Sequence, residues 1–317
     1  MALRNMRIWR YIDEVSRAGS VRQAAERLHV TPSALLRRIQ DVEHDLGAPI
    51  FERDTTGVKL TAAGEIFVAW IRSQEADLRR VYSQIEDLSG LKRGEVSIAC
   101  SQATQGFIVE QIERFRRTHP LVRFRITISD HNSALTALAD YAADLVLVFR
   151  PPHAIELQPI MTLGQRLVAI MGHDHPLAAR PTLRLRELME YEIALPGASF
   201  GGREIIEQIL AKSSMRLNVM VEANSFSVLA DLVRGGRLVT FQIEIGALKH
   251  AADPGLAIRP VDDVDLAHGP LVLGQLKGRA LPLPAAKFAE QLSASLDQLR
   301  SLPMAGSPQE DELSVRS

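Results

Sequence analysis

The stretch "GSVRQAAERLHVTPSALLRRIQ", residues 19–40, decides the fold of the N-terminal part of the chain. Ser20 followed three residues later by Gln23 is a capping box, so a short helix is predicted to start here. Thr31 can cap a second helix, and Pro32 suits its first position because an N–H there would have no helical partner. Only two residues separate the predicted helices, so the helices are expected to cross steeply, as in a helix-turn-helix.

The flanking segments complete a small domain. Apolar residues recur at helical spacing over residues 6–15, which predicts a preceding helix that closes a three-helix core. The segment "PIFERDTTGVKL", residues 49–60, predicts two short strands around a turn, which would add a wing. The fold class predicted for residues 1–60 is therefore an all-α winged helix-turn-helix.

The basic residues of this domain form a local excess, because the whole chain of 317 residues has a formal net charge of -1. Residues 17–40 contain five arginines and one acidic residue, Glu26. One interpretation is a solvated helix face. We favour DNA binding, because Ser33 and Arg37 project opposite the apolar face of the second helix, where phosphate contact and major-groove entry are expected. The candidate DNA-binding residues are Ser20, Arg22, Thr31, Pro32, Ser33, Arg37, Arg38 and Arg53.

A long helix is predicted to follow, within a linker of residues 61–92. Residues 65–89 contain neither proline nor glycine, and apolar side chains recur at alternating steps of four and three. The heptad positions are Phe67, Ile71, Gln74, Leu78, Val81, Ile85 and Leu88. We expect this stripe to pair with the same helix of a second subunit in a homodimer; the alternative is that the stripe covers the next domain.

Beyond a hinge at "LSGLKRG", residues 88–94, extended apolar segments alternate with helical ones. This alternation predicts a mostly parallel sheet with flanking helices, and the pattern runs through two rounds, which indicates two subdomains. The polar, proline-bearing tail of residues 301–317 is expected to be disordered.

One segment carries a family resemblance. Residues 24–65, "AAERLHVTPSALLRRIQDVEHDLGAPIFERDTTGVKLTAAGE", resemble the winged helix-turn-helix of LysR-type transcriptional regulators. The residues that fall where the family places such residues are Ala24, Ala25, Leu28, Ala34, Ile39, Glu43, Leu46, Gly47, Phe51, Arg53, Leu60, Thr61 and Gly64. Leu36 departs from the pattern, because the family usually has Ser or Thr there, which puts one hydroxyl contact to the DNA backbone in question.

The resemblance implies a two-lobed effector domain of the type 2 periplasmic-binding-protein-like α/β fold over residues 93–300. Lobe I would comprise residues 93–162 and 267–300, and lobe II residues 163–266. The family resemblance further implies that the protein binds double-stranded promoter DNA as a dimer or tetramer, with a small-molecule effector between the lobes and RNA polymerase as a further partner. Arg150 and the helix N-termini favour an anionic effector.

Effector contacts are expected where strands of an open sheet end. By this rule the candidate effector-binding residues are Ser101, Gln102, Ala103, Thr104, Phe149, Arg150, Ser199, Phe200 and Gln242. Ser101 and Thr104 have an alternative role, because their hydroxyls could simply cap the helix that follows.

Other classes of protein are disfavoured. No nucleophile elbow surrounds Ser101, so no enzyme activity and no cofactor are expected. His173 and His175 are two residues apart, as in some metal sites, but a surface turn before Pro176 is the better interpretation. A single cysteine, the lack of a secretory signal pattern and the lack of a long apolar run predict a cytoplasmic protein. The alternative function is a cytoplasmic solute-binding or sensor protein without sequence-specific DNA binding.

Overall fold

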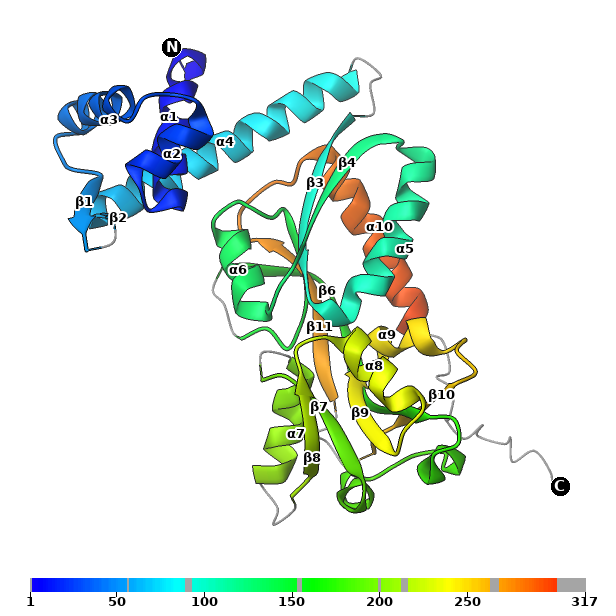
Figure 1. The fold of residues 1–317 in the computed structure, drawn as a ribbon. Coiled ribbons are helices and arrows are strands. Elements are labelled where there is room, and N and C mark those ends of the chain that lie inside the picture. Colours follow the sequence, from blue (N-terminus) through cyan, green and yellow to red (C-terminus); the bar gives the residue numbers. More distant parts are fainter. Residues whose placement is uncertain are drawn as a thin grey trace. The chain divides into compact units, whose positions relative to one another are not determined.

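The structure is a computed structural model that describes residues 2–55, 57–88, 93–152, 156–198, 201–211, 216–262 and 268–300. The chain divides into two compact units, residues 1–82 and 83–317, which we call the N-terminal and C-terminal units and describe in turn (Figure 1). None of the described helices is long and apolar enough to cross a membrane.

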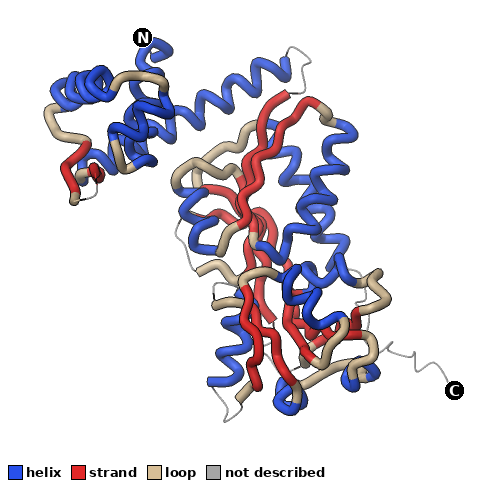
Figure 2. Tube along the Cα trace, in the orientation of Figure 1, coloured by secondary structure: helices blue, strands red, loops and turns tan. Residues whose placement is uncertain are grey.

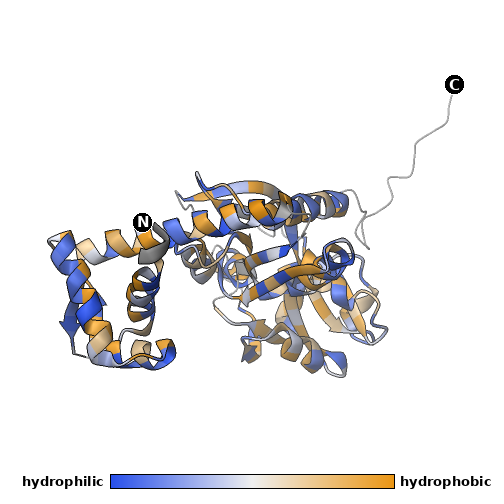
Figure 3. Ribbon diagram, turned by 90° about the horizontal axis from the view of Figure 1, so that it is seen from above, coloured by the Kyte–Doolittle hydropathy of each residue, from blue (hydrophilic) through white to orange (hydrophobic). Residues whose placement is uncertain are grey.

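The N-terminal unit is a helix-turn-helix domain with a wing, as its sequence predicts. Its elements are α1 (Ala2–Ala18), α2 (Val21–Leu28), α3 (Pro32–Leu46), the antiparallel strands β1 (Phe51–Asp54) and β2 (Gly57–Leu60), and most of α4 (Ala62–Leu88). Ile12, Val15, Leu35 and Ile39 lie in one buried cluster with Ala24 and Ala25. The helices of this unit are banded by hydropathy in Figure 3, as expected for helices that bury one face.

The predicted helix boundaries hold because each has a side-chain or backbone cap. The Ser20 side chain accepts a hydrogen bond from the backbone N–H of Gln23, and Thr31 accepts one from Ala34. His29 and Gly47, which follow α2 and α3, both adopt the left-handed conformation that ends helices.

Two sets of hydrogen bonds fix the wing against the helices. Oε1 of Glu43 on α3 accepts the backbone N–H groups of Ile50 and Phe51, at 2.7 and 3.1 Å. Thr61 caps α4 by accepting from Gly64 at 3.0 Å, and its hydroxyl donates to the Pro49 carbonyl at 2.6 Å. The start of β1 is thus held from both sides.

The heptad interpretation of α4 was wrong for its first half. Ile71 is fully buried in the core of the N-terminal unit, with Phe67 packed against the same cluster. The reason is that the first half of α4 packs against α1, α2 and α3 in the core of its own unit. The exposed apolar side chains of α4 are Ile66, Trp70, Val81, Tyr82, Ile85 and Leu88. Val81, Ile85 and Leu88 belong to the predicted stripe.

A charged contact ties α4 to α1. Asp13 accepts from Arg72 at 2.7 Å and from Arg17 at 2.6 Å, with Asp13 and Arg72 both nearly buried. Because the carboxylate receives two guanidinium groups, α1 and α4 are joined by a charge-assisted bond as well as by apolar packing.

The C-terminal unit is built on a sheet of nine strands with helices on its faces (Figures 1 and 2). Its first part contains β3 (Arg93–Cys100), η1 (Gln102–Thr104), α5 (Gln105–Thr118), β4 (Leu121–Ile128), α6 (His131–Ala139), β5 (Leu145–Phe149) and β6 (Leu157–Gly172). Its middle part contains η2 (Pro176–Ala179), η3 (Leu185–Glu190), β7 (Glu192–Pro196), α7 (Gly201–Ala211), β8 (Asn218–Ala223), α8 (Phe226–Arg234) and β9 (Leu238–Ile243). Its last part contains α9 (Glu244–Ala247), η4 (Leu248–His250), β10 (Leu256–Pro260), β11 (His268–Leu276) and α10 (Leu283–Arg300).

The sheet is parallel only in its two outer groups. Strands β4, β3 and β5 are parallel, and so are β8, β7 and β9. Strands β6 and β11 between them run antiparallel to their neighbours. The expectation of a mostly parallel sheet missed this centre, because a chain that crosses between two groups and returns must do so in opposite directions.

We call the group of β3, β4, β5, β11, η1, α5, α6 and α10 lobe I, and the group of β7, β8, β9, β10, α7, α8, α9 and η4 lobe II. The strand β6 belongs to both, because residues 157–166 pair with β11 and residues 167–172 pair with β9 and β10. Both lobes share one buried apolar cluster.

A glycine in α4 allows the closest approach in the N-terminal unit. A Cβ on Gly64 would lie 2.0 Å from the Ile50 carbonyl oxygen. We predict that Gly64→Ala destabilises the N-terminal unit by about 1–3 kcal/mol, because a backbone atom cannot move aside as a side chain can. Hydrogen exchange of α1 to α3 measures this loss. Gly164→Ala, whose Cβ would meet nothing within 4 Å, is the matched control and leaves exchange unchanged; equal protection in the two variants would contradict the prediction.

Candidate DNA interface and effector cleft

The second helix of the helix-turn-helix presents one polar face to solvent. Ser33, Leu36 and Arg37 on α3 are exposed, whereas Leu35 and Ile39 are 0% and 2% exposed. The Ser33 hydroxyl lies 3.4 Å from the Thr31 hydroxyl at the start of the helix. Leu36, at 44% exposure, is an apolar side chain within this otherwise polar face.

The arginines of this domain are not equivalent. Three of them are ion-paired: Arg17 with Asp13, Arg22 with Glu26, and Arg27 with Glu14. Counting charges over residues 17–40 alone overstated the basic excess, because α1 supplies two acids from just outside that range.

The remaining arginines have a different environment. Arg38 places its guanidinium 5.7 Å from the centre of the Tyr11 ring on α1. Arg37 on α3 and Arg53 on β1 are exposed and have no ion pair among the residues that the structure describes. Arg37 and Arg53 are therefore the arginines of the described α2, α3 and wing that have neither an ion pair nor a contact with an aromatic ring.

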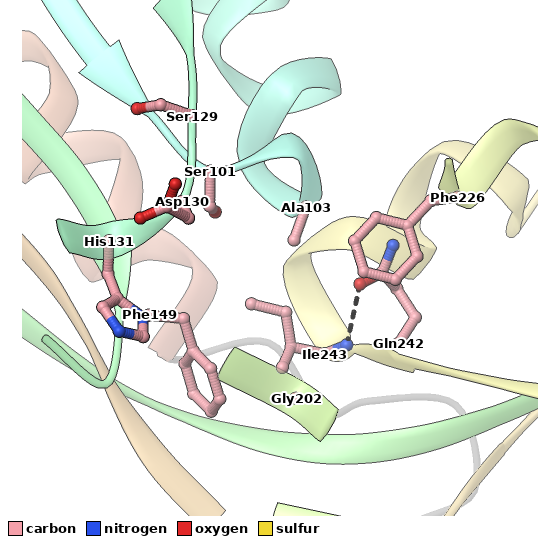
Figure 4. Close-up of a pocket in the computed structure, with 10 residues that line it drawn as sticks. All are labelled: Ser101, Ala103, Ser129, Asp130, His131, Phe149, Gly202, Phe226, Gln242 and Ile243. Atoms are coloured by element: carbon pink, nitrogen blue, oxygen red, sulfur yellow. Dashed lines mark hydrogen bonds between the residues drawn. The ribbon is translucent and has the colours of Figure 1, made fainter. Parts of the chain in front are cut away.

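A cavity lies between the two lobes of the C-terminal unit (Figure 4). Lobe I contributes residues from the carboxyl ends of β3, β4 and β5, and lobe II contributes residues from α7, α8 and β9. The lining residues are Ser101, Ala103, Ser129, Asp130, His131, Phe149, Gly202, Phe226, Gln242 and Ile243. The rule that ligands bind beyond the carboxyl ends of strands thus applies to both lobes.

The structure brings together four of the residues predicted for this site: Ser101, Ala103, Phe149 and Gln242. Three others do not line the cavity, namely Gln102, Thr104 and Arg150. Ser199 and Phe200 lie outside the described residues.

Thr104 and Ser101 have opposite roles. Thr104 is fully buried, and its hydroxyl donates to the Ser101 carbonyl at 2.9 Å. This hydrogen bond stabilises the turn of residues 101–104. Ser101 precedes η1 but makes no side-chain cap, and its buried hydroxyl oxygen has no hydrogen-bond partner among the described residues. The capping alternative is therefore wrong for both residues, because neither hydroxyl caps the helix that follows it.

Hydrogen-bond donors remain unused on both sides of the cavity. The buried hydroxyl oxygen of Ser129 has no partner within the described chain, like that of Ser101. Gln242 is 3% exposed, and its Oε1 accepts from the Ile243 N–H at 3.2 Å. Its Nε2 group has no acceptor in the part of the chain that the structure describes. A buried polar group without a partner is costly, so these groups fit a ligand that supplies acceptors.

Asp130 is a charged group in the lining. Its two oxygens accept from the backbone N–H and the hydroxyl of Ser133, at 2.9 and 2.7 Å, and so cap α6. These hydrogen bonds lower the pKa of the Asp130 carboxyl, which therefore stays negative.

Sequence reasoning missed the residues after β4. "SDHN", residues 129–132, follows the strand of residues 121–128 just as Ser101 follows β3, so the same rule would have found Ser129, Asp130 and His131. Phe226 was missed because it starts a helix rather than ends a strand.

Two hydrogen bonds join the lobes beside the cavity. Oε1 of Gln102 in lobe I accepts from the Phe226 N–H at the start of α8 at 2.8 Å, and Arg150 donates to Oε1 of Gln208 on α7 at 3.1 Å. The cavity between them measures about 30 Å³, room for roughly two waters. Full enclosure of a larger molecule would therefore need a wider cavity.

We predict that Gln102→Ala exposes the first turn of α8, because the Phe226 N–H loses the partner supplied by lobe I. Amide hydrogen exchange at residues 226–229 should rise by about tenfold, the effect of losing one hydrogen bond. Gln105→Ala, an exposed residue three positions on, is the control. Unchanged exchange in Gln102→Ala would show that the contact does not hold the lobes together.

The chain's cysteine lies next to the cavity but does not line it. Burial raises the pKa of Cys100 to about 11, so the group is a protonated thiol at neutral pH. A protonated, buried thiol is a poor nucleophile.

The expected surface turn at residues 173–176 is only half exposed. His173 is exposed, but His175 is 5% exposed, accepts the Leu177 N–H at Nδ1, and lies 3.3 Å from the Arg237 carbonyl through Nε2. No group of three or more potential metal ligands occurs among the described residues. His175 is thus a hydrogen-bonded core residue.

This burial predicts a pH effect. Desolvation lowers the pKa of His175 below its ordinary value of 6.5, so its contribution to stability is complete above pH 6.5 and is lost as the pH falls through the lowered folded-state pKa. The thermal unfolding temperature should fall more steeply in the wild type than in His175→Gln as the pH is lowered from 7.5 to about 5. His173→Gln, at the exposed position, should keep the wild-type slope; a parallel slope in all three proteins would contradict the assignment.

A winged helix-turn-helix joined to a two-lobed α/β domain with a cavity between its lobes defines an effector-responsive DNA-binding protein. Comparison with known sequences identifies the family. The profile described as bacterial regulatory helix-turn-helix protein, lysR family, matches residues 6–65, and the LysR substrate binding domain matches residues 89–297. The second match alone spans more than half of the chain, which therefore belongs to the LysR family of DNA-binding transcriptional regulators.

Related regulators match this chain over most of its length. The HTH-type transcriptional activator CmpR of a Synechocystis strain is 24% identical over 280 residues, which are 88% of this chain and 92% of that protein. The HTH-type transcriptional regulator CbbR of Sinorhizobium medicae is 26% identical over 306 residues, 96% of each. These relatives are transcriptional regulators and not enzymes.

Solved structures share the fold. Full-length OxyR of Pseudomonas aeruginosa has a TM-score of 0.67 at 19% identity and covers 96% of this chain and 98% of its own. Full-length CbnR in complex with its target DNA has a TM-score of 0.60 at 19% identity, covering 92% and 99%. The regulatory domain of Synechocystis CcmR in complex with 2-PG has a TM-score of 0.57 at 20% identity, covering 65% and 99%.

Proposed function

We propose that this regulator reads promoter DNA with the exposed face of α3 and the wing. The observation that carries the proposal is the position of Ser33 and Arg37 opposite the buried Leu35 and Ile39, at the N-terminal end of a capped helix. A helix in this setting enters the major groove with its first residues toward the bases. CbnR, a protein with this fold, has been solved on its target DNA.

Each candidate residue then has a definite task. Arg37 reaches base edges, and Arg53 on the wing contacts a phosphate, because both guanidinium groups are unpaired among the described residues. Leu36 can contact a thymine methyl in place of the hydroxyl that the family usually has there. The contacts proposed near phosphates are those of Ser20, Arg22, Thr31, Pro32, Ser33 and Arg38.

We infer a homodimer formed through α4. The exposed apolar residues of α4 support it, since two recognition helices on one duplex need a twofold partner. A tetramer and a contact with RNA polymerase are part of the proposal through the family alone. So is a cytoplasmic location, where promoter DNA is found.

The effector is proposed to be a small molecule with one carboxylate or carbonyl acceptor, held by the Ser101 and Ser129 hydroxyls and the Gln242 amide. The unpaired donors support this chemistry. Asp130 is negative, and no lysine or arginine lines the cavity among the described residues, which favours a molecule with little negative charge. CcmR, solved with 2-PG, shows that the fold accepts a small ligand.

The proposed organisation is a DNA-binding domain of residues 1–60, a linker of residues 61–92, lobes of residues 93–162 with 267–300 and 163–266, and a tail of residues 301–317. Effector entry changes the angle between the lobes, and α4 transmits the change to the DNA-binding pair. Because affinities are linked, effector and operator must then alter one another's affinity by the same factor.

Fluorescence-anisotropy titration with a duplex selected from a random pool by the purified protein tests the DNA proposal. We expect binding that survives a random competitor and weakens steeply with salt. Arg37→Ala should weaken the selected duplex by about tenfold to a hundredfold, the effect of losing a base contact.

The matched control is Arg117→Ala, which removes an exposed arginine from α5 of the effector domain and should leave the affinity unchanged. Equal, weak binding of every duplex would favour the alternative, a solute-binding or sensor protein without sequence-specific DNA binding. Equal loss in the two variants would show a general charge effect rather than a reading helix.

A further inference from the structure

The C-terminal unit has a second cavity, larger than the cleft. This groove has a volume of about 290 Å³, against about 30 Å³ for the cavity between Ser101 and Gln242. It lies where α5 and α10 of lobe I meet α9 and η4 of lobe II (Figure 1). The groove is therefore large enough for a small organic molecule without any movement of the lobes.

Two cations from different lobes stand at the groove. Arg114 on α5 and Lys249 on η4 both line it, both are exposed, and neither has an ion pair among the described residues. Glu110, one turn before Arg114, lines the groove as well but does not pair with it. The charged lining thus has one more positive than negative group.

A buried amide forms the polar part of the wall. Gln111 is 4% exposed, and its Oε1 accepts from the Ser295 hydroxyl at 2.8 Å and from Nε2 of Gln291 at 3.1 Å. Because α10 holds the oxygen, the orientation of the amide is set. Its Nε2 has no acceptor in the described part of the chain, so one amide donor is left over at the groove.

Much of the remaining wall is apolar, and Gln298 on α10 is a further polar residue in it. Phe107 on α5, Ile245 on α9 and Leu248 on η4 line the groove beside the cations. The combination of two cations, an unpaired amide donor and apolar side chains matches the chemistry of an amphipathic organic anion.

We propose that this groove is a second small-molecule site, distinct from the cleft, which takes a monocarboxylate with a short apolar chain. The carboxylate lies between Arg114 and Lys249 and accepts from Gln111, and the chain packs on Phe107 and Leu248. The site goes beyond the effector cleft, because it shares no lining residue with it.

The position of the groove couples it to the lobes. Its ligand would contact α5 of lobe I and η4 of lobe II at once, so occupancy favours one lobe angle over others. α9 directly follows Gln242 and Ile243 of the cleft, and a Cβ on Gly246 would lie 2.9 Å from the Ala103 carbonyl oxygen. The two sites therefore share the same closely packed segment.

Isothermal titration of the full-length protein with hexanoate tests the proposal. We expect saturable one-site binding, and about tenfold or greater loss of affinity in the double variant Arg114→Gln with Lys249→Gln, because charge-assisted contacts are lost. Hexanoate should also slow acetylation of Lys249 relative to Lys277, which is read by mass spectrometry.

Two control variants separate this site from the others. Arg117→Gln changes an exposed arginine of the same helix outside the groove, and Gln242→Leu changes the cleft; both should bind hexanoate as the wild type does. Retained affinity in the double variant, loss of affinity in Gln242→Leu, or hexanol binding as tightly as hexanoate would each overturn the proposal. So would a gain of hexanoate binding on truncation after Arg300, because the chain's own C-terminal segment would then be the occupant.

Discussion

The pairing of β6 with both halves of the sheet is the constraint on which the C-terminal unit depends. One continuous strand bonds to β11 along its first part and to β9 and β10 along its second. Backbone hydrogen bonds fix its register in each lobe, so the lobes can change their angle only by bending near this strand and β11. The cleft and the groove both lie between the lobes, so each contains residues from both of them.

The parts of the fold that could be predicted from sequence are those decided by neighbours in the chain. Ser20 and Thr31 set helix starts through contacts within a few residues, and these predictions are confirmed. The wing strands were predictable for the same reason. Ile71 was misassigned because its partners lie in α1 to α3, and a periodic stripe does not say which surface buries it.

The same distinction between local and distant contacts applies to the residues of the candidate sites. Position after a strand identified Ser101 and Phe149, since that property is local. Which side chain turns into the cavity is decided by contacts across the unit: Gln102 reaches α8 instead, and Arg150 reaches Gln208. The pairing of Arg27 with Glu14 on another helix likewise depends on how α1 packs, so charge counting over one window could not find it.

The lone cysteine has a practical consequence for work on this protein. Cys100 is buried with its thiol protonated, so maleimide and nitroxide reagents should find almost no native target. A thiol introduced on the surface of each lobe would then carry a fluorophore or spin label at a known place without removing any natural residue. The lobe angle thus becomes a distance that spectroscopy can follow in the otherwise unaltered chain.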